Sequence, residues 1–471
     1  MARDRRRGSC RGRGRGAFRG RGRATRRLLP AVDRRAASVG RVAGRSGAMT
    51  VRSKALNDLL ARLDRSYLSA RSLAYPSKYY VAVCSVCDIR CPYCPRQYFK
   101  SDVDAGVMSL EDFRGLAPWL KYSNYTGLFG LGEPFLHKRF LEFIQLTKQA
   151  GAYAATSSHG MSLTPRNIDE LIGLELDELE LSIDAPSRRL FEFLRCGARF
   201  DEVMRAARHL RSRKTVLRRD KPKVHVASAI SRHNVRSMPA LVRLAKDIGA
   251  ARIVFTDLII VDPNNKDLSV AGTAVMGRNL KKAAAEARRW GIEMLYFRQN
   301  PFPWRDARPP GQSGIVDRRA HPSEPILDCT PPIVEARDER FGCPEAWGGL
   351  IVERDGRCKP CCYIGEIMGN AFEAPPEAIE NGERKTMLKR ALTRGQLTAP
   401  CRDCCNLVRV TPEYVANVLE EVASAAAETP LAPPEREEIE ERLGEYRRLF
   451  TEREGLSPFT AATARAAPPP A

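Results

Sequence analysis

Short apolar runs alternate with amphipathic stretches from residue 78 to residue 290. The strand candidates among them are Tyr79–Val83, Thr126–Leu131, Tyr153–Ser157, Glu178–Ile183, Val224–Ile230 and Arg252–Asp257. The helix candidates between them are Leu110–Lys121, Lys138–Ala150, Pro165–Gly173, Phe200–Arg213 and Val235–Gly249. Regular strand–helix alternation requires right-handed crossovers between parallel strands. The pattern therefore predicts an α/β fold, a partial (β/α)6 TIM-like barrel, with functional loops at the carboxyl ends of its strands.

The regular alternation ends near Gly291. Farther along the chain, Gly349–Glu353 and Arg357–Cys361 flank Arg354-Asp355-Gly356 and predict a β-hairpin with a tight turn. A helix is predicted near Ala55–Leu68, and charged helices follow Pro412. The predicted organisation is, in chain order, 1–48 disordered Arg/Gly-rich segment, 49–77 helical lead-in, 78–290 barrel, 291–342 linker, 343–410 cysteine-rich hairpin module, 411–460 C-terminal helices and 461–471 disordered tail.

The net charge of +22 is unevenly distributed. Residues 1–48 contain 16 arginines, no lysine and two acids, so the rest of the chain carries only +8. An RNA-binding tail and a targeting peptide are two interpretations of this segment. We favour a third, in which translation begins at Met49. The chain has neither an apolar run of the ~20 residues that cross a bilayer nor the apolar core of a signal peptide, so we expect a cytoplasmic protein.

Cysteine is the informative residue type, with fourteen in the chain. One group is Cys84, Cys87, Cys91 and Cys94, and the second is Cys343, Cys358, Cys361, Cys362, Cys401, Cys404 and Cys405. Cys10, Cys196 and Cys329 stand apart. In a cytoplasmic chain, clustered cysteines indicate metal or redox chemistry more often than disulfides.

The first group directly follows the first predicted strand. Thiolates at the spacing of Cys87, Cys91 and Cys94 can hold three irons of a [4Fe–4S] cluster and leave the fourth iron open for a cofactor. The alternative is a zinc site with Cys84 as a fourth ligand. The strand–helix context favours the cluster, with Cys84 as a small buried residue at the end of the strand.

This motif resembles that of the radical S-adenosylmethionine (SAM) superfamily. The resemblance extends over residues 78–260. Within this range, Gly130-Leu131-Gly132-Glu133-Pro134 follows the second strand and is similar to the family's GGEP motif. The resemblance implies that Gly130, Gly132 and Glu133 bind the methionine amino group of SAM. Leu131 replaces one glycine of the motif.

Further SAM contacts are implied at the ends of later strands. Ser182 and Asp184 are expected near the ribose, although Asp184 could instead cap the next helix. Tyr93 is expected near the adenine, and Ser157 on the SAM or substrate side. Ser228 and Asn234 are further SAM-contact candidates, whereas a lone histidine such as His159 is more often structural.

The second cysteine group resembles the SPASM/Twitch auxiliary domain of radical SAM enzymes. This resemblance rests on the segment Cys343-Pro-Glu-Ala-Trp347 and on the hairpin. It implies a second [4Fe–4S] cluster on four ligands: Cys343, Cys361, Cys401 and Cys404. Cys358, Cys362 and Cys405 are surplus, and neighbouring strand residues such as Cys361 and Cys362 point to opposite faces. A zinc knuckle and a two-cluster SPASM domain are the alternatives.

The resemblance implies reductive cleavage of SAM to a 5′-deoxyadenosyl radical that abstracts a substrate hydrogen. A fully ligated second cluster suits an electron relay in the net oxidation of a small molecule. The alternative is maturation of a ribosomally made peptide, although the stretch between Met49 and Tyr79 leaves no room for a peptide-recognition domain. A non-catalytic zinc protein that binds RNA is the remote alternative. The expected partners are the substrate and a one-electron donor such as flavodoxin or ferredoxin, without membrane or nucleic acid, and no residue pattern identifies a catalytic base.

Overall fold

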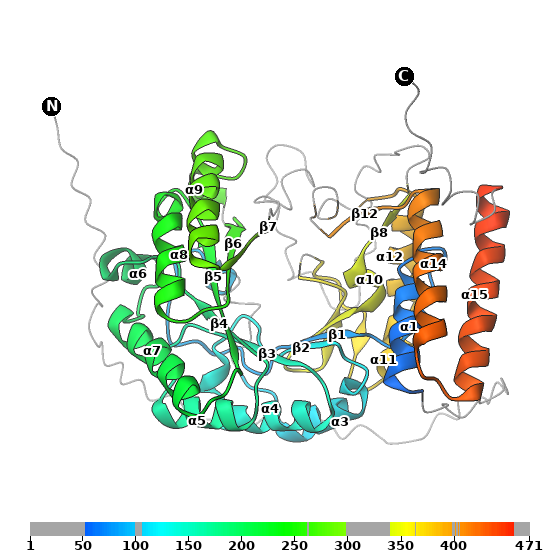
Figure 1. Ribbon diagram of the computed structural model, residues 1–471, viewed down its shortest axis with the longest axis horizontal. Coiled ribbons are helices and arrows are strands. Elements are labelled where there is room, and N and C mark those ends of the chain that lie inside the picture. Colours follow the sequence, from blue (N-terminus) through cyan, green and yellow to red (C-terminus); the bar gives the residue numbers. More distant parts are fainter. Residues whose placement is uncertain are drawn as a thin grey trace, which may run out of the picture. The chain divides into compact units, whose positions relative to one another are not determined.

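The computed structural model describes residues 52–98, 106–260, 263–297, 340–362, 364–397, 401, 404 and 406–455 (Figure 1). These residues belong to one compact unit that begins at Arg52. The predictions for residues 1–48 and 461–471, and for most of the 291–342 linker, lie outside the described residues. The predicted domain boundaries stay predictions.

The barrel sheet contains the six strands that the sequence predicts and a seventh. These strands are β1 (Lys78–Val81), β2 (Tyr125–Gly127), β3 (Ala154–Ser158), β4 (Glu178–Ser182), β5 (Lys223–Ile230), β6 (Arg252–Asp257) and β7 (Glu293–Phe297). They lie in sequence order, and each is parallel to the next. The partial α/β barrel is therefore confirmed.

The helices between the strands cover one side of the curved sheet (Figure 1). In chain order the barrel region contains α2 (Pro95–Tyr98), α3 (Leu110–Leu120), η1 (Pro134–Leu136), α4 (Phe140–Gln149), α5 (Pro165–Gly173), α6 (Arg188–Leu194), α7 (Phe200–Val216), η2 (Val235–Ser237), α8 (Met238–Asp247), η3 (Pro263–Leu268) and α9 (Ala274–Trp290). The sequence did not predict α6 or α9. Between β4 and β5, α6 adds a second helix ahead of α7.

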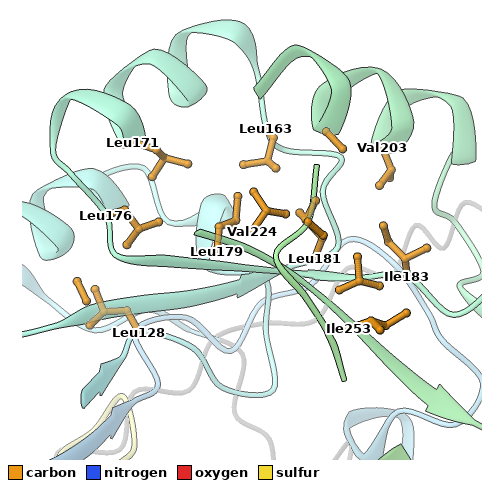
Figure 2. Packing of buried hydrophobic residues seen from close by; sticks show 14 of the residues in the cluster. Leu128, Leu163, Leu171, Leu176, Leu179, Leu181, Ile183, Val203, Val224 and Ile253 are labelled. Carbon is orange, nitrogen blue, oxygen red and sulfur yellow. The ribbon is translucent and has the colours of Figure 1, made fainter. Parts of the chain in front are cut away.

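The two faces of the sheet have different chemistry because side chains alternate along each strand. The helix-facing side chains form the main core, as Figure 2 shows for Leu179, Leu181, Val224 and Ile253. The opposite, inner-face side chains of β4 are Glu178, Glu180 and Ser182, all only partly buried. The inner face is thus polar and accessible, whereas the outer face provides the apolar burial that stabilises the fold.

The cysteine-rich module continues the barrel sheet. Its strands β9 (Gly349–Val352) and β10 (Arg357–Lys359) form the predicted hairpin, with Gly356 at a φ of 83° in the turn. Strand β9 also pairs in parallel with β1, so that Lys78 lies opposite Gly349 and Val81 opposite Val352. With β11 (Gly369–Asn370), the described part of this sheet has ten strands. Hairpin and barrel therefore share one sheet.

A second core joins the two ends of the described chain. It packs α1 (Lys54–Asp64) against α14 (Pro412–Glu428) and α15 (Pro433–Glu454), with Tyr67 and Trp347 between. The other elements of this region are β8 (Phe341–Gly342), α10 (Pro344–Gly348), α11 (Pro376–Glu380), α12 (Glu383–Thr393) and β12 (Val408–Arg409), of which β8 and β12 pair antiparallel. Within the described ranges, no helix combines the length and the apolar character needed to span a bilayer.

Candidate active site

The three thiols of the first motif lie together in the loop between β1 and α2. Burial raises the pKa of the Cys91 thiol to about 12, the nearby Arg195 lowers it, and Cys94 and Cys87 raise it. Burial also raises the pKa of Cys87, with a further contribution from Cys94. Thiols with such pKa values bind iron as the metal replaces their protons. The thiolate charges of Cys87, Cys91 and Cys94 act on one another, as expected for three ligands of one cluster.

Cys84 does not belong to this set of donors. It is 1% exposed, forms an isolated bridge with Val107, and its thiol donates to the Val86 carbonyl over 3.6 Å. A zinc site would need a fourth ligand here, whereas a [4Fe–4S] cluster with one open iron needs only three. The donor set therefore fits the cluster, and Cys84 is buried as predicted, although it lies beyond the end of β1.

The glycine-rich loop after β2 packs directly against the cysteine loop. A Cβ on Gly132 would lie 2.4 Å from the Cys84 carbonyl oxygen and 2.7 Å from that of Val86, so only glycine fits. The next residue, Glu133, donates its backbone N–H to the Val86 carbonyl over 2.8 Å. A Cβ on Gly130 would lie 2.7 Å from that of Ala82. The motif thus sets the position of the cysteine loop.

The Glu133 carboxylate points into the protein. It is 2% exposed, accepts the Ser158 hydroxyl at 2.8 Å and accepts the His159 backbone N–H at 2.9 Å. Burial raises the pKa of Glu133, while the nearby His159 lowers it. These bonds join the β2 and β3 loops, and the predicted contact of Glu133 with the SAM ammonium stays a prediction.

His159 lies between two carboxylates. Its Nε2 is 2.8 Å from Asp88 Oδ1 and 3.3 Å from Glu133 Oε2, and its side chain is buried. Cys87, Asp88 and His159 have ligand atoms within 4.8 Å of one another, and they form the one such group in the described part of the chain. The hydrogen bond to Asp88 accounts for this proximity, in keeping with a structural histidine.

Asp184 organises the ends of β4 and β5. Its Oδ1 accepts the Ala229 N–H at 2.9 Å, and its Oδ2 is 2.8 Å from Arg195 Nε. Asn234 donates from Nδ2 to the Asp184 carbonyl over 2.9 Å. Helix α6 begins after Ser187 instead, so Asp184 does not cap it. Asp184 and Asn234 therefore lie together, and their predicted contacts with SAM stay predictions.

Arg195 is a site residue that the sequence analysis missed. Burial opposes its charge, but Asp184, Cys91 and Cys94 raise the pKa of the guanidinium above its usual value. A fixed positive charge beside these thiols would favour a negatively charged thiolate cluster. The sequence offered no reason to place Arg195 near the cysteines, because α6, which ends just before Arg195, was not predicted.

Ser157 and Ser182 meet on the inner face. Their hydroxyl oxygens are 3.5 Å apart, and Ser157 donates to Glu180 Oε1 over 3.0 Å. Tyr93 stacks on His233 with ring centroids 6.4 Å apart, and His233 meets Phe193 edge-on at 5.3 Å. These aromatic rings offer a surface to a planar group such as adenine.

Ser228 lies on the other side of the sheet. It shares its face of β5 with Val226 and Ile230, which belong to the helix-facing core, and its hydroxyl is buried with no hydrogen-bond partner among the described residues. Ala229 occupies the inner face instead, opposite Thr256. The structure does not bring Ser228 to the other predicted SAM contacts, because the sequence pattern did not establish which residues of β5 face inward.

The second cysteine group gathers thiols from distant parts of the module. Burial, with smaller contributions from Cys404 and Cys401, raises the pKa of Cys343 to about 12. Cys361 is half-buried and Cys362 exposed, and both follow the last residue of β10, so the strand-face argument for this pair was wrong. The structure thus brings Cys343, Cys401 and Cys404 together, and Cys361 as fourth ligand stays a prediction.

The remaining cysteine of the hairpin is not available as a ligand on that side. Cys358 is fully buried in the barrel core, and its thiol donates to the Gly356 carbonyl over 3.3 Å. Cys405 lies outside the described residues. The three neighbouring thiols fit a second iron–sulfur cluster, and Cys361 stays the predicted fourth ligand.

Comparison with known proteins agrees with this arrangement. Residues 81–218 match the radical SAM superfamily, and residues 343–405 match SPASM, an iron–sulfur cluster-binding domain. The chain therefore contains a radical SAM domain followed by an auxiliary domain of the SPASM type. The predicted cofactors, SAM and [4Fe–4S] clusters, are thereby confirmed, while the residues that hold them stay predictions.

Two curated relatives match part of the chain. A tungsten-containing aldehyde ferredoxin oxidoreductase cofactor-modifying protein from Pyrococcus furiosus is 25% identical over 193 residues, which cover 39% of this chain and 52% of that protein. A GTP 3′,8-cyclase from Chlorobaculum tepidum is 29% identical over 133 residues, which cover 27% of this chain and 38% of that protein. The chain thus spans about half or less of the length of these relatives.

Among solved structures, Streptococcus suis SuiB bound to the precursor peptide SuiA has the same fold. The similarity covers 74% of this chain and 75% of that chain, with a TM-score of 0.51 and 13% sequence identity.

Proposed function

We propose that this enzyme catalyses the net two-electron oxidation of a small biosynthetic intermediate. The observation that carries the proposal is the parallel pairing of β1 with β9, which places the first cysteine loop and the auxiliary module on one continuous sheet. Lys78 at the start of β1 forms a 2.7 Å ion pair with Glu345, which lies two residues after Cys343. This arrangement supports electron transfer between the inner face of the barrel and the second cluster.

The reaction removes two hydrogen atoms from the substrate. When bound, the reduced first cluster and SAM supply a 5′-deoxyadenosyl radical that takes one hydrogen atom. The substrate would then lose a proton to a base and a further electron, for which a cluster held by Cys343, Cys361, Cys401 and Cys404 would be the acceptor, so the product has one new double bond. The chain's own residues contribute placement, through the Gly132 contact that fixes the cysteine loop and through the Arg195–Asp184 pair beside Cys91.

A chain of aromatic rings supports the relay. Lys78 Nζ lies 5.8 Å from the centroid of the Tyr80 ring, and Tyr80 and Tyr125 have centroids 5.7 Å apart. Tyr125 in turn stacks on Tyr153 at 5.9 Å. These contacts run along the inner face from the module side of β1 to the start of β3.

Peptide maturation is the second candidate. Ser157 on β3 and Glu178, Glu180 and Ser182 on β4 are partly exposed on the inner face, which accommodates an extended chain as well as a small molecule. The SuiB structure that shares this fold was solved with a precursor peptide. We further propose a flavodoxin or ferredoxin as electron donor and a cytoplasmic location, where such reduced carriers are found.

The anaerobically reconstituted enzyme tests the proposal against panels of amino sugars and short peptides. Deoxyadenosine formation identifies the compounds that are turned over, and mass spectrometry measures the products. Net oxidation gives a product with two hydrogen atoms fewer than the substrate, formed in a one-to-one ratio with deoxyadenosine. A product of unchanged composition would indicate a redox-neutral rearrangement and overturn the proposal.

A further inference from the structure

The inner face of the barrel is a mixed aromatic and polar surface, and its carboxyl group Glu180 forms no ion pair among the described residues. The aromatic side chains come from β1, β2 and the residue before β3, and the polar ones from β3, β4 and β5. On β4, Glu180 lies four residues before Asp184, about 13 Å along the strand at about 3.3 Å per residue. A ligand group at Glu180 would therefore lie within the barrel, below the end that carries the cysteine loop.

Several other charged groups of this face form ion pairs. His225 Nδ1 is 2.9 Å from Glu178 Oε1, and Glu178 also accepts the Tyr153 hydroxyl at 3.1 Å. Lys78 pairs with Glu345, and Arg195 pairs with Asp184.

Glu180 differs from these acids. Its Oε1 accepts the Ser157 hydroxyl at 3.0 Å, and no lysine, arginine or histidine of the described ranges forms an ion pair with it. Burial raises the pKa of Glu180, whereas His225 and Arg195 lower it from beyond ion-pair distance, so a cation in direct contact would stabilise the ionised form further. Glu180 also contributes, after burial and Glu178, to the raised pKa of Tyr125, which stacks on Tyr153. A carboxylate beside stacked rings suits an organic cation, since rings attract positive charge on their faces.

A metal ion is a poorer match for this position. Within the described part of the chain, Glu180 belongs to no group of three ligand atoms close enough to hold a metal. An aliphatic ammonium needs only one carboxylate, a hydroxyl and an apolar or aromatic surface for its carbon atoms.

We propose that Glu180 is a specificity-determining residue that binds an ammonium group of the substrate on the inner face. The inference deepens the proposed function and rests on it, because it assigns the substrate of that reaction to the class of aliphatic amines. Ser157 holds the carboxylate in place, and the Tyr125–Tyr153 pair covers the carbon chain next to the charge.

The test uses the holoenzyme with SAM and two probes of similar size, n-butylammonium and neutral n-butanol. Calorimetric titration under anaerobic conditions gives the affinity for each. The wild type should bind the ammonium at least about tenfold more tightly than the alcohol, since a charge-assisted hydrogen bond is lost with the alcohol. Glu180→Gln should reduce this preference to within about twofold. The matched control is Glu170→Gln, an exposed position on α5, which should keep the wild-type preference.

Two outcomes would overturn the inference: equal affinity of the wild type for both probes, or an undiminished preference in Glu180→Gln. Iron content and circular dichroism establish that each variant is folded. If Glu180→Gln does not fold, Glu180→Asp serves instead, and it should retain a preference for the ammonium that is weaker than that of the wild type. SAM cleavage by the wild type is measured in parallel, so that a failure of the proposed function is seen independently of ammonium binding.

Discussion

The first cysteine loop and the auxiliary module hold their thiols by different means. Cys87, Cys91 and Cys94 lie within eight residues, and backbone contacts from Gly132 and Glu133 position the loop that carries them. Cys343 and Cys404, in contrast, are sixty-one residues apart, and α10, α12 and the β8–β12 pair lie between or beside them. The first site is local and the second depends on tertiary structure.

This difference has a consequence for stability. A loop held by backbone hydrogen bonds next to a packed sheet can keep its shape without metal. A site assembled from distant segments gains part of its folding energy from the metal that joins them. We therefore expect substitutions at the two sites to have different effects. Loss of the first set of thiols should affect only the chemistry, whereas loss of the second should affect the chemistry and also destabilise the module.

The largest effect is expected from the triple change Cys87→Ala, Cys91→Ala and Cys94→Ala. It should abolish reductive cleavage of SAM, because no other thiol of the described loop can replace the ligands, Cys84 being turned to the Val86 carbonyl. Iron content should fall from about eight to about four per chain as one [4Fe–4S] cluster is lost. Stoichiometric zinc with negligible iron in the anaerobic wild type would contradict the cluster assignment.

The second prediction concerns the buried charges that support the module. Glu380 pairs with Lys385 and with Lys389 (2.6 Å to the latter), and all three side chains are fully buried. Glu380→Gln would leave two buried lysines without a counter-charge, and should lower the free energy of unfolding by about 3–5 kcal/mol. Anaerobic denaturant titration measures this, with the exposed Glu440→Gln as control.

The pH dependence of stability sharpens that prediction. Burial opposes ionisation of Glu380, but Lys385 and Lys389 hold its pKa below the ordinary 4.5. A lowered pKa in the folded state gives stability that is present above pH 4.5 and is lost as the pH falls below it. The wild type should lose this contribution on acidification, whereas Glu380→Gln should not. Parallel pH curves for the two proteins would contradict the assigned role of the pair.

A smaller effect is expected from Glu133→Ala. If the carboxylate contacts the SAM ammonium, its loss should weaken SAM binding by about ten- to a hundredfold while the first cluster still assembles. The change would also remove the acceptor of the Ser158 hydroxyl and the His159 N–H, and so loosen the link between the β2 and β3 loops. An unchanged SAM dissociation constant in equilibrium dialysis would restrict Glu133 to the second of these roles.

The sequence predicted the local features of the molecule well. The three-cysteine spacing, the glycine motif and the individual strands are properties of short segments, and each is found where it was expected. The hairpin was also predicted, because Asp355-Gly356 is a local turn signal. Its pairing with β1 was not, since β9 and β1 are separated by most of the barrel and no local pattern specifies that neighbour.

Two site residues show where prediction from sequence ended. Ser228 was counted as a SAM contact, but the alternation of β5 turns it toward the helices, and a shift of one residue in register reverses that choice. Arg195 was overlooked, although its charge lies beside Cys91 and Cys94, because it follows a short helix with no clear start signal. The first error concerns side-chain direction, which the tertiary fold determines, and the second a helix that was not predicted.

The central claim is that the second cluster accepts an electron from the substrate, and the double variant Cys401→Ala, Cys404→Ala tests it most directly. With dithionite as electron source, the variant should still cleave SAM, because the first three thiols lie on a separate loop. Iron content and circular dichroism must show the first cluster and the fold intact. The account predicts deoxyadenosine without a matching amount of oxidised product. A folded variant that keeps the wild-type ratio of product to deoxyadenosine would contradict it.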